Sequence, residues 1–305
     1  MEAPIDRRQS ENLSVTNAQP RVALLGKSIG AEVTGIDVGA GVDEPSMAFI
    51  RDALNRHSVV VLRNQNFTSE DQVAFARRLG DIRTSFYNRY SVPGQPELSV
   101  VSNILKDGEA IGIADAGMLW HTDASYLKTP DMYTLLYGLE IPHRDGKAMG
   151  DTIFSSAWGA YDALPDAVKT RIDTLHATHS FADHLEKKKK AKNLKRAPLT
   201  AAQKAELPDV EHPVVRTHPL TQRRCLFVTE GHTSSIVGLP AEESDTLLQQ
   251  LWDQIRKPEF HYRHSWRKGD LIIWDNCAVQ HLAVFDYGDV PRRLHRAGVL
   301  GPVPY

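Results

Sequence analysis

The sequence is poor in cysteine and has no long apolar run. Its 305 residues include only two cysteines, Cys225 and Cys277. Two cysteines are too few for a disulfide framework and are compatible with a reducing cytoplasm. No apolar stretch is long enough to span a bilayer, and residues 1–20 lack the apolar core of a signal peptide. We therefore expect a cytoplasmic protein that makes no membrane contact.

An excess of charge of either sign is also missing. The formal net charge is -2 at pH 7, so the chain has no basic field that would attract nucleic acid. A small molecule is the expected partner, and a homo-oligomer remains open. The composition, 41% hydrophobic and 24% charged, is typical of a globular protein with a sizeable core. We predict a disordered leader over residues 1–20 and a single domain over residues 21–305.

Short apolar runs between turn signals predict a chain rich in strands. The clearest is residues 58–62 (SVVVL), a continuous β-branched segment typical of a strand that is buried on both faces. Residues 271–274 (LIIW) form a similar run directly after a Gly-Asp turn. Further strands are expected over residues 22–25, 31–38, 98–101, 132–139 and 226–228.

Three segments have helical spacing. Residues 45–57 begin with a proline, which a first helical turn tolerates, and continue with apolar residues at helical intervals. Thr68 opens a sequence that resembles a capping box, and the helix that follows is expected to end at Gly80. A longer amphipathic helix is predicted from Pro240 to Ile255. Helices therefore flank a mainly β structure.

One basic run lies in the second half of the chain. Residues 184–204 include the sequence KKKKAKNLKR. Such runs are usually solvated, as a surface helix or a loose loop. A second interpretation is a mobile lid whose cations attract an anionic substrate, because long insertions in compact domains often cover active sites. Nucleic-acid binding is not expected, since no aromatic residues interleave with the lysines.

Two separated clusters contain residues that could hold a metal. His121 and Asp123 are two residues apart, so on an extended segment their side chains project from the same face and can share one ion. His281 follows the sequence WDN far along the chain. Two histidines and one carboxylate leave three positions of an octahedral Fe(II) open. A closed zinc site would need a fourth ligand, and neither cysteine is placed convincingly to supply it.

Three ordered blocks resemble the taurine dioxygenase / 2,4-dichlorophenoxyacetate dioxygenase family of 2-oxoglutarate-dependent oxygenases. Residues 120–126 (WHTDASY) are similar to the family's metal-binding block, residues 149–152 (MGDT) to its Gly-Gly-Asp-Thr block, and residues 274–292 to its distal histidine and arginine block. The likeness extends from about residue 22 to residue 301. Met149 and Cys277 depart from the family pattern. They remove no metal ligand, but they weaken any transfer of substrate from the name-giving enzymes.

The resemblance implies a fold and a set of roles. The fold is a distorted double-stranded β-helix, a cupin-like jelly roll that is mainly β with flanking helices. His121, Asp123 and His281 would bind Fe(II), while Thr152 and Arg292 would bind the distal carboxylate of 2-oxoglutarate. The implied enzyme uses O2 to hydroxylate or desaturate a small anionic metabolite and releases succinate and CO2. A metal-dependent hydrolase and a non-catalytic ligand-binding barrel are the alternatives.

Further side chains are candidates for ligand contact. Arg293 competes with Arg292 for the carboxylate, although alternation along a strand lets only one of them face the pocket. Arg296 lies four residues beyond Arg292 and so points to the same side. There it could bind the cosubstrate, anchor an anionic substrate or form a surface ion pair. The stretches that the family places near its pocket also predict three substrate contacts, Asn103, Tyr126 and His232.

Overall fold

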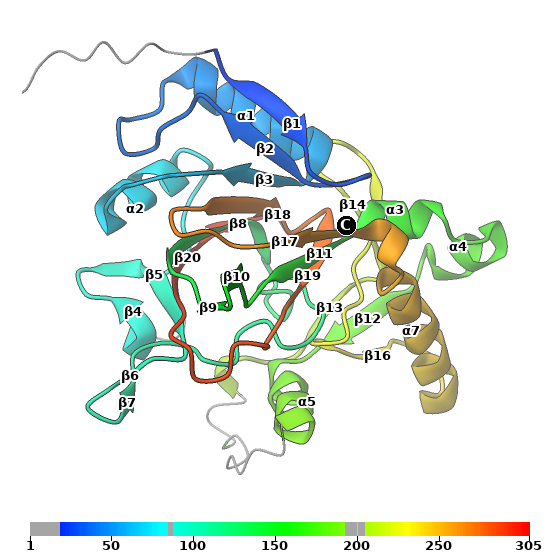
Figure 1. The fold of residues 1–305 in the computed structure, drawn as a ribbon. Helices are drawn as coiled ribbons and strands as arrows, with labels where there is room; N and C mark the ends of the chain where they lie inside the picture. The colour runs from blue at the N-terminus through cyan, green and yellow to red at the C-terminus, as the bar shows by residue number, and fades with distance from the viewer. Residues whose placement is uncertain (1–18, 85–87, 193–199, 201–204) are drawn as a thin grey trace, which may run out of the picture.

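An eight-stranded sheet runs through the molecule (Figure 1). The structure is a computed structural model that describes residues 19–84, 88–192, 200 and 205–305, so the predicted leader lies outside the described residues except for its last two. Within the sheet β2 and β3 are parallel and the other neighbours antiparallel. The strands, in order across it, are β1 (Arg21–Leu24), β2 (Ala31–Thr34), β3 (Val59–Leu62), β18 (Leu271–Asp275), β8 (Asp131–Glu140), β20 (Arg293–Leu300), β5 (Gln95–Ser102) and β4 (Ser91–Val92).

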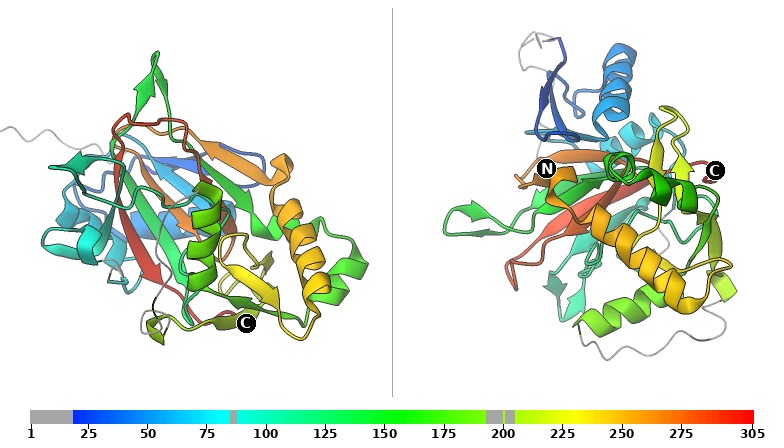
Figure 2. Two further views of the ribbon diagram at one scale, coloured as in Figure 1. Left: turned by 90° about the horizontal axis from the view of Figure 1, so that it is seen from below. Right: turned by 90° about the vertical axis from the view of Figure 1, so that its right-hand side faces the viewer.

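A three-stranded sheet packs against the inner face of the large one (Figures 1 and 2). Its order is β17 (His261–His264), β11 (Thr152–Ser156) and β19 (Val279–Ala283). Val61 and Leu294 of the large sheet share one apolar cluster with Phe154 and Val279 of the small one. Two sheets that enclose a core in this way are the architecture of a jelly roll. The predicted fold class is confirmed.

Smaller β elements complete the chain. They are the sheet of β13 (Val210–Pro213), β12 (His176–His179) and β16 (Thr233–Ile236), and the pairs β6 (Leu105–Lys106) with β7 (Glu109–Ala110), β9 (His143–Arg144) with β10 (Lys147–Ala148), and β14 (Val215–Thr217) with β15 (Arg224–Leu226). Two 3-10 turns are η1 (Asn88–Tyr90) and η2 (Pro258–Phe260).

Helices lie outside the two sheets (Figure 2). α1 (Glu44–His57) and α2 (Ser69–Arg77) cover the outer face of the large sheet, where Ile50 and Leu54 pack with Val60 and Leu62. α3 (Ala157–Asp162), α4 (Asp166–Ile172) and α7 (Ala241–Ile255) build a second core around Leu248. α5 (Phe181–Lys192) lies at the bottom of Figure 1, and Nζ of its Lys187 is 5.4 Å from the centre of the Trp252 ring on α7. None of the helices in the described residues is long and apolar enough to cross a membrane.

The local predictions are largely confirmed. α1 begins after Asp43, whose carboxylate accepts a hydrogen bond from the Ser46 N–H, and α2 has the capping box expected at Thr68. Three boundaries were wrong: β2 ends at Thr34, α2 ends at Arg77, and β15 covers residues 224–226 instead of 226–228. β15 is shifted because it forms a hairpin with β14, in which Leu226 already pairs with the first residue, Val215.

The first half of the basic run is helical and docked. Residues 184–192 belong to α5, whereas 193–199 and 201–204 lie outside the described residues. Lys187 donates to the carbonyl oxygens of Glu230 and Thr233 at 2.8 and 2.7 Å, and buried Lys188 pairs with Asp115 at 2.8 Å. The interpretation of this run as solvated is therefore wrong for these two lysines, whose charges are used to attach α5.

Candidate metal and cosubstrate site

His121, Asp123 and His281 lie together between the two sheets. The ligand-type atoms of the three buried residues are all within 4.8 Å of one another. Nε2 of His121 is 3.6 Å from one carboxylate oxygen of Asp123, and Nε2 of His281 is 3.8 Å from the other. The fold thus brings together the three side chains that the sequence predicted as metal ligands.

Backbone and ring contacts orient the two histidines. His121 and His281 exchange both backbone hydrogen bonds, at 3.1 and 2.9 Å. Nδ1 of His121 lies 2.8 Å from the carbonyl oxygen of Leu119, so an N–H at this position leaves the Nε2 lone pair directed at the centre of the triad. The His281 ring packs between Phe154 and Trp274, with centroids 5.9 and 4.7 Å away. Both imidazoles are held in a ligating orientation.

The Asp123 carboxylate is held from the large sheet. The Thr134 hydroxyl donates to it at 2.6 Å, and Arg296 reaches its other oxygen at 3.0 Å. Asn276 ties this arrangement together, because its amide donates to Thr134 at 2.9 Å and accepts from the backbone N–H of Asp123 at 3.2 Å. These partners leave the carboxylate one orientation, facing the two histidines.

The protonation states suit metal ligation. Burial alone raises the pKa of Asp123, but Arg296 and the two histidines outweigh this effect and hold that pKa well below its usual value. Burial and the neighbouring His121 lower the pKa of His281 to about 3. A metal ligand must be an ionised carboxylate or a neutral imidazole. At neutral pH these groups therefore fit a divalent cation.

Arg292 is a buried cation that contacts the segment leading into β11, the strand that pairs with the His281 strand. Its side chain is 4% exposed, and no carboxylate of the described residues forms an ion pair with it. Nη2 donates to the carbonyl oxygen of Gly150 at 3.2 Å, whereas Nε is buried without a hydrogen-bond partner in the described chain. Arg293, the competing candidate, is exposed. The guanidinium also lies over the Tyr287 ring, 5.5 Å from its centre. Since a buried charge without an ion-pair partner is costly, Arg292 is suited to bind an anion.

Thr152 faces the same interior as His281. On the small sheet Phe154 pairs with His281 and Thr152 pairs with Ala283, so the Thr152 and His281 side chains share one face, about 7 Å apart along the strands. The Thr152 hydroxyl is buried and accepts a hydrogen bond from Nε1 of Trp266 at 3.1 Å. Thr152 begins β11 of the small sheet and Arg292 directly precedes β20 of the large sheet, so both can reach one carboxylate from the two sides.

Arg296 takes a different position from Arg292. Its guanidinium bridges Asp123 and Asp131, at 3.0 and 3.2 Å, on the large-sheet side of the triad. Arg83 also reaches Asp131, at 2.8 Å. Arg296, whose side chain is 27% exposed, thus pairs with two buried carboxylates, one of them a predicted metal ligand, and the pair is more than the surface ion pair considered from the sequence.

Asn103 contacts the backbone that carries Arg292. Its side-chain oxygen accepts from the Arg292 N–H at 2.9 Å, and its amide nitrogen donates to the carbonyl oxygens of Gly288 and Val290, both at 3.0 Å. Ser102 donates to the Arg292 carbonyl oxygen at 2.7 Å. Asn103 was predicted to contact substrate; in this structure its amide positions the arginine.

Four aromatic rings close one side of the site. Tyr126 lies 4.8 Å from Phe181 and 5.1 Å from His232, and His184 lies 4.3 Å from His232 and 6.1 Å from Phe181, measured between centroids. His232 is also 5.7 Å from His121. Burial lowers the pKa of His184 to about 3 and that of His232 well below its usual value, so this ring cluster is uncharged at neutral pH.

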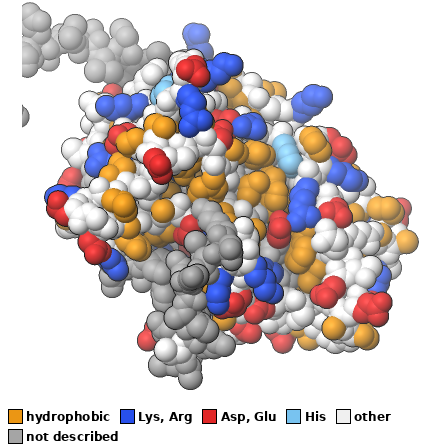
Figure 3. Space-filling model, turned by 60° about the horizontal axis from the view of Figure 1, so that its bottom comes forward, with side chains coloured by type: hydrophobic (Ala, Val, Ile, Leu, Met, Phe, Trp, Pro, Cys, Tyr) orange, Lys and Arg blue, Asp and Glu red, His pale blue; other side chains and the backbone are white. Residues whose placement is uncertain are grey.

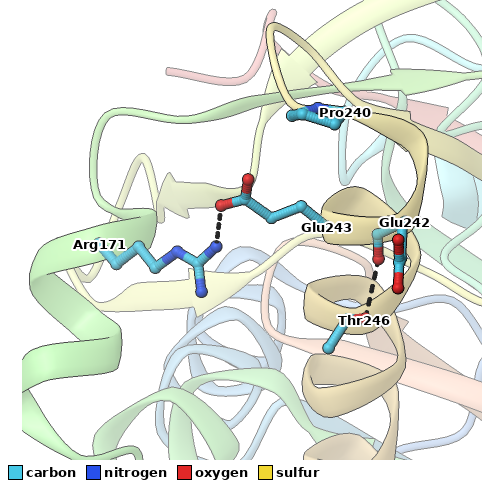
Figure 4. A pocket seen from close by; sticks show the side chains of 5 residues that line it. All are labelled: Arg171, Pro240, Glu242, Glu243 and Thr246. Atoms are coloured by element: carbon cyan, nitrogen blue, oxygen red, sulfur yellow. Dashed lines mark hydrogen bonds and ion pairs between the residues drawn. The ribbon is translucent and has the colours of Figure 1, made fainter.

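The sequence did not single out Trp266, Phe181 or His184. Phe181 and His184 reach the site because α5 docks over it, and Trp266 reaches Thr152 from the loop between β17 and β18. No spacing rule connects these residues with their partners. A separate open depression at the start of α7, lined by Arg171, Pro240, Glu242, Glu243 and Thr246, contains none of the triad (Figure 4).

Two histidines and an aspartate that could hold a metal ion, together with a buried arginine in a jelly roll, fit the class of 2-oxoglutarate-dependent oxygenases. The chain belongs to the family described as "Taurine catabolism dioxygenase TauD, TfdA family", whose model matches residues 21–297. It is a 2-oxoglutarate-dependent dioxygenase, and the family resemblance found in the sequence is confirmed.

Individual relatives cover most of the chain. The alpha-ketoglutarate-dependent 2,4-dichlorophenoxyacetate dioxygenase of Burkholderia sp. (strain RASC) is 33% identical over 84% of this chain and 87% of its own length. The alpha-ketoglutarate-dependent sulfate ester dioxygenase of Pseudomonas putida is 30% identical over 90% and 88%. The crystal structure of a taurine dioxygenase from Burkholderia xenovorans superposes with a TM-score of 0.78 at 32% identity, covering 94% of this chain and 91% of that one.

Proposed function

We propose that this dioxygenase is a cytoplasmic Fe(II) enzyme that oxidises a small anionic metabolite with O2 and converts 2-oxoglutarate to succinate and CO2. His121, Asp123 and His281 would hold the iron. Thr152 and Arg292 would hold the distal carboxylate of 2-oxoglutarate. The cytoplasmic assignment is supported by two cysteines that are both free thiols. Whether the enzyme is a homo-oligomer remains a prediction of the sequence alone.

The observation that carries the proposal is the buried guanidinium of Arg292, which forms no ion pair among the described residues and contacts Gly150, two residues before Thr152. Two histidines and a carboxylate occupy one face of an octahedral ion and leave the other face for a chelating ligand and O2. A planar guanidinium binds a carboxylate through two parallel hydrogen bonds. A metal-dependent hydrolase would need no such anion clamp.

The protein contributes position and protection to the reaction. When bound, the iron supplies the redox chemistry by which O2 oxidises 2-oxoglutarate and then the substrate. Thr134 and Asn276 keep the Asp123 carboxylate facing the histidines, while Asn103 holds the backbone of Arg292. The ring cluster excludes water from the side that α5 covers. Orientation of the two reactants is the main task of these side chains.

The substrate is proposed to be an anion with an apolar portion. The names of the two curated relatives specify a phenoxyacetate and a sulfate ester. Arg296, which pairs with Asp123 and Asp131, could bind such an anion in place of one of these two carboxylates. Tyr126 and His232 would contact the apolar portion. The face on which α5 lies gathers hydrophobic side chains, with side chains of both charges around them (Figure 3), which suits a ligand with an apolar portion.

The proposal is tested with the purified protein. Under anaerobic conditions it should bind one Fe(II) per chain and, with 2-oxoglutarate, develop the weak visible band of a bidentate keto-acid chelate. With O2 present, a panel of carboxylates, sulfonates and sulfate esters should include compounds that stimulate succinate formation. A protein that binds no Fe(II) and consumes no 2-oxoglutarate with any compound would support the hydrolase or the ligand-binding barrel instead.

Gly150→Ala is expected to weaken 2-oxoglutarate binding by displacing Arg292. Gly150 has φ +74°, and an added Cβ would lie 2.8 Å from Nε of Arg292. The left-handed backbone alone costs an alanine about 1–2 kcal/mol of stability. Gly146→Ala is the matched control, because Gly146 has φ +76° and open space around it. Gly150→Ala should lose at least as much stability as Gly146→Ala in denaturant unfolding, while only Gly150→Ala should lose cosubstrate affinity. Equal affinity in both variants would contradict the expectation.

Residues 184–192 are expected to gain protection from hydrogen exchange when substrate binds. This part of α5 is attached through Lys187, Lys188 and the His184 ring, whose Nδ1 lies 3.0 Å from the Gly231 carbonyl oxygen. A ligand that fills the space beside His232 would hold these contacts together, so local opening would become less frequent. Exchange in α1, which packs on the outer face of the large sheet, should not change. Protection of α5 that is the same with and without substrate would refute a lid role.

A further inference from the structure

Trp266 is buried next to the proposed carboxylate clamp and is held rigidly. Its side chain is 1% exposed and packs edge-on against His264, with centroids 5.0 Å apart. The turn that follows it is pinned to β8, because Gly269 donates to the Gly138 carbonyl oxygen at 2.8 Å. The Asp270 carboxylate accepts from the Arg267 N–H at 2.7 Å and closes the same turn. The indole therefore has a defined position relative to the small sheet.

The direction of one hydrogen bond follows from the chemistry of the indole. A tryptophan Nε1–H can only donate, whereas a threonine hydroxyl has one proton to donate and two lone pairs that accept. In the 3.1 Å contact between Trp266 and Thr152, the hydroxyl must therefore be the acceptor. The Thr152 proton stays available, and the part of the chain that the structure describes offers it no acceptor.

From this we infer that Trp266 is a positioning residue that turns the O–H of Thr152 toward the distal carboxylate of 2-oxoglutarate. The inference rests on the proposed role of Thr152 and extends it to a residue that does not touch the cosubstrate. Without the indole N–H, the hydroxyl of a threonine on a strand is free to rotate and to donate to a nearby carbonyl oxygen instead. The clamp then loses one directed donor, while Arg292 and the triad are unchanged.

Trp266→Phe removes the N–H and keeps an aromatic ring in the core. Its affinity for 2-oxoglutarate, titrated anaerobically with Fe(II) by the visible band or by calorimetry, should fall roughly three- to tenfold, as expected for one neutral hydrogen bond. Fe(II) affinity should be unchanged. Binding of 2-oxopentanoate, which has the same keto-acid end but no second carboxylate, should also be unchanged. Trp252→Phe on α7 is the matched control, because Nε1 of Trp252 has no hydrogen-bond partner in the described chain. This variant should bind 2-oxoglutarate normally.

A double-mutant cycle with Thr152→Val separates positioning from general damage. The Trp266→Phe effect should vanish in the Thr152→Val background, since no hydroxyl is left to orient. Three results would overturn the inference: normal 2-oxoglutarate binding by Trp266→Phe, an equal loss for 2-oxopentanoate, or an undiminished effect in the double variant. In these cases Thr152→Val alone would still weaken 2-oxoglutarate if the proposed function holds. Normal binding by Thr152→Val and Arg292→Ala would instead refute the proposed function.

Discussion

His281→Ala should abolish Fe(II) binding and, with it, the visible band of the 2-oxoglutarate complex. The substitution removes one of three protein ligands and leaves a bidentate set of His121 and Asp123. The loss of Fe(II) affinity should exceed the roughly 10- to 100-fold that follows when only a hydrogen-bond partner of a ligand is removed. Anaerobic titration with Fe(II), followed by 2-oxoglutarate, measures both effects. The same result is expected for His121→Ala.

Exposed His176 on β12 provides the control for this prediction. His176→Ala changes the histidine content by the same amount and should bind Fe(II) and develop the band as the wild type does. Circular dichroism and thermal unfolding would establish that both variants are folded. A folded His281→Ala protein that retained the band would show that another residue supplies the third ligand.

Arg292→Ala should cost about 2–5 kcal/mol of 2-oxoglutarate binding, or roughly 30-fold or more in apparent affinity. The distal carboxylate would lose its bidentate partner, and the two neighbouring arginines are an exposed one, Arg293, and one already paired with Asp123 and Asp131, Arg296. Arg292→Lys should restore only part of the loss, because an ammonium keeps the charge but not the planar fork. Fe(II) binding should survive both changes, so the visible band, recovered at high 2-oxoglutarate concentration, measures the affinity directly.

The neighbouring arginines test the assignment. Arg293→Ala should bind 2-oxoglutarate normally, because the Arg293 side chain is exposed. Arg296→Ala should raise the substrate concentration required for turnover more than it weakens the cosubstrate, since its guanidinium lies with Asp123 and Asp131 and does not reach the Gly150 region. If Arg296→Ala weakened 2-oxoglutarate and Arg292→Ala did not, the assignment of the two roles would be reversed.

The buried charge network could not be predicted from spacing. Arg296 and Arg292 point to one side of the chain, as strand alternation indicates, yet they have different partners. Arg296 meets Asp123 and Asp131 because β20 pairs with β8 along its whole length. Arg292 precedes that strand and lies over Gly150, in the chain that leads into β11. Partners of this kind depend on which strands become neighbours, and long-range pairing has no local signal in a sequence.

The sequence by itself determined local elements of secondary structure and the motifs of the family. The β-branched run of β3, the proline and cap of α1, and the capping box of α2 each depend on residues within a few positions of one another. The three blocks of the family resemblance were enough to identify the metal ligands as candidates.

Only the tertiary structure decided which side chains surround them. Asn103 holds the backbone of Arg292, α5 brings His184 to the ring cluster, and Trp266 donates to Thr152. Each of these contacts joins segments that are distant in the chain. They form because burial of the two sheet faces sets the strand order, and the strand order then determines which distant polar groups can satisfy one another.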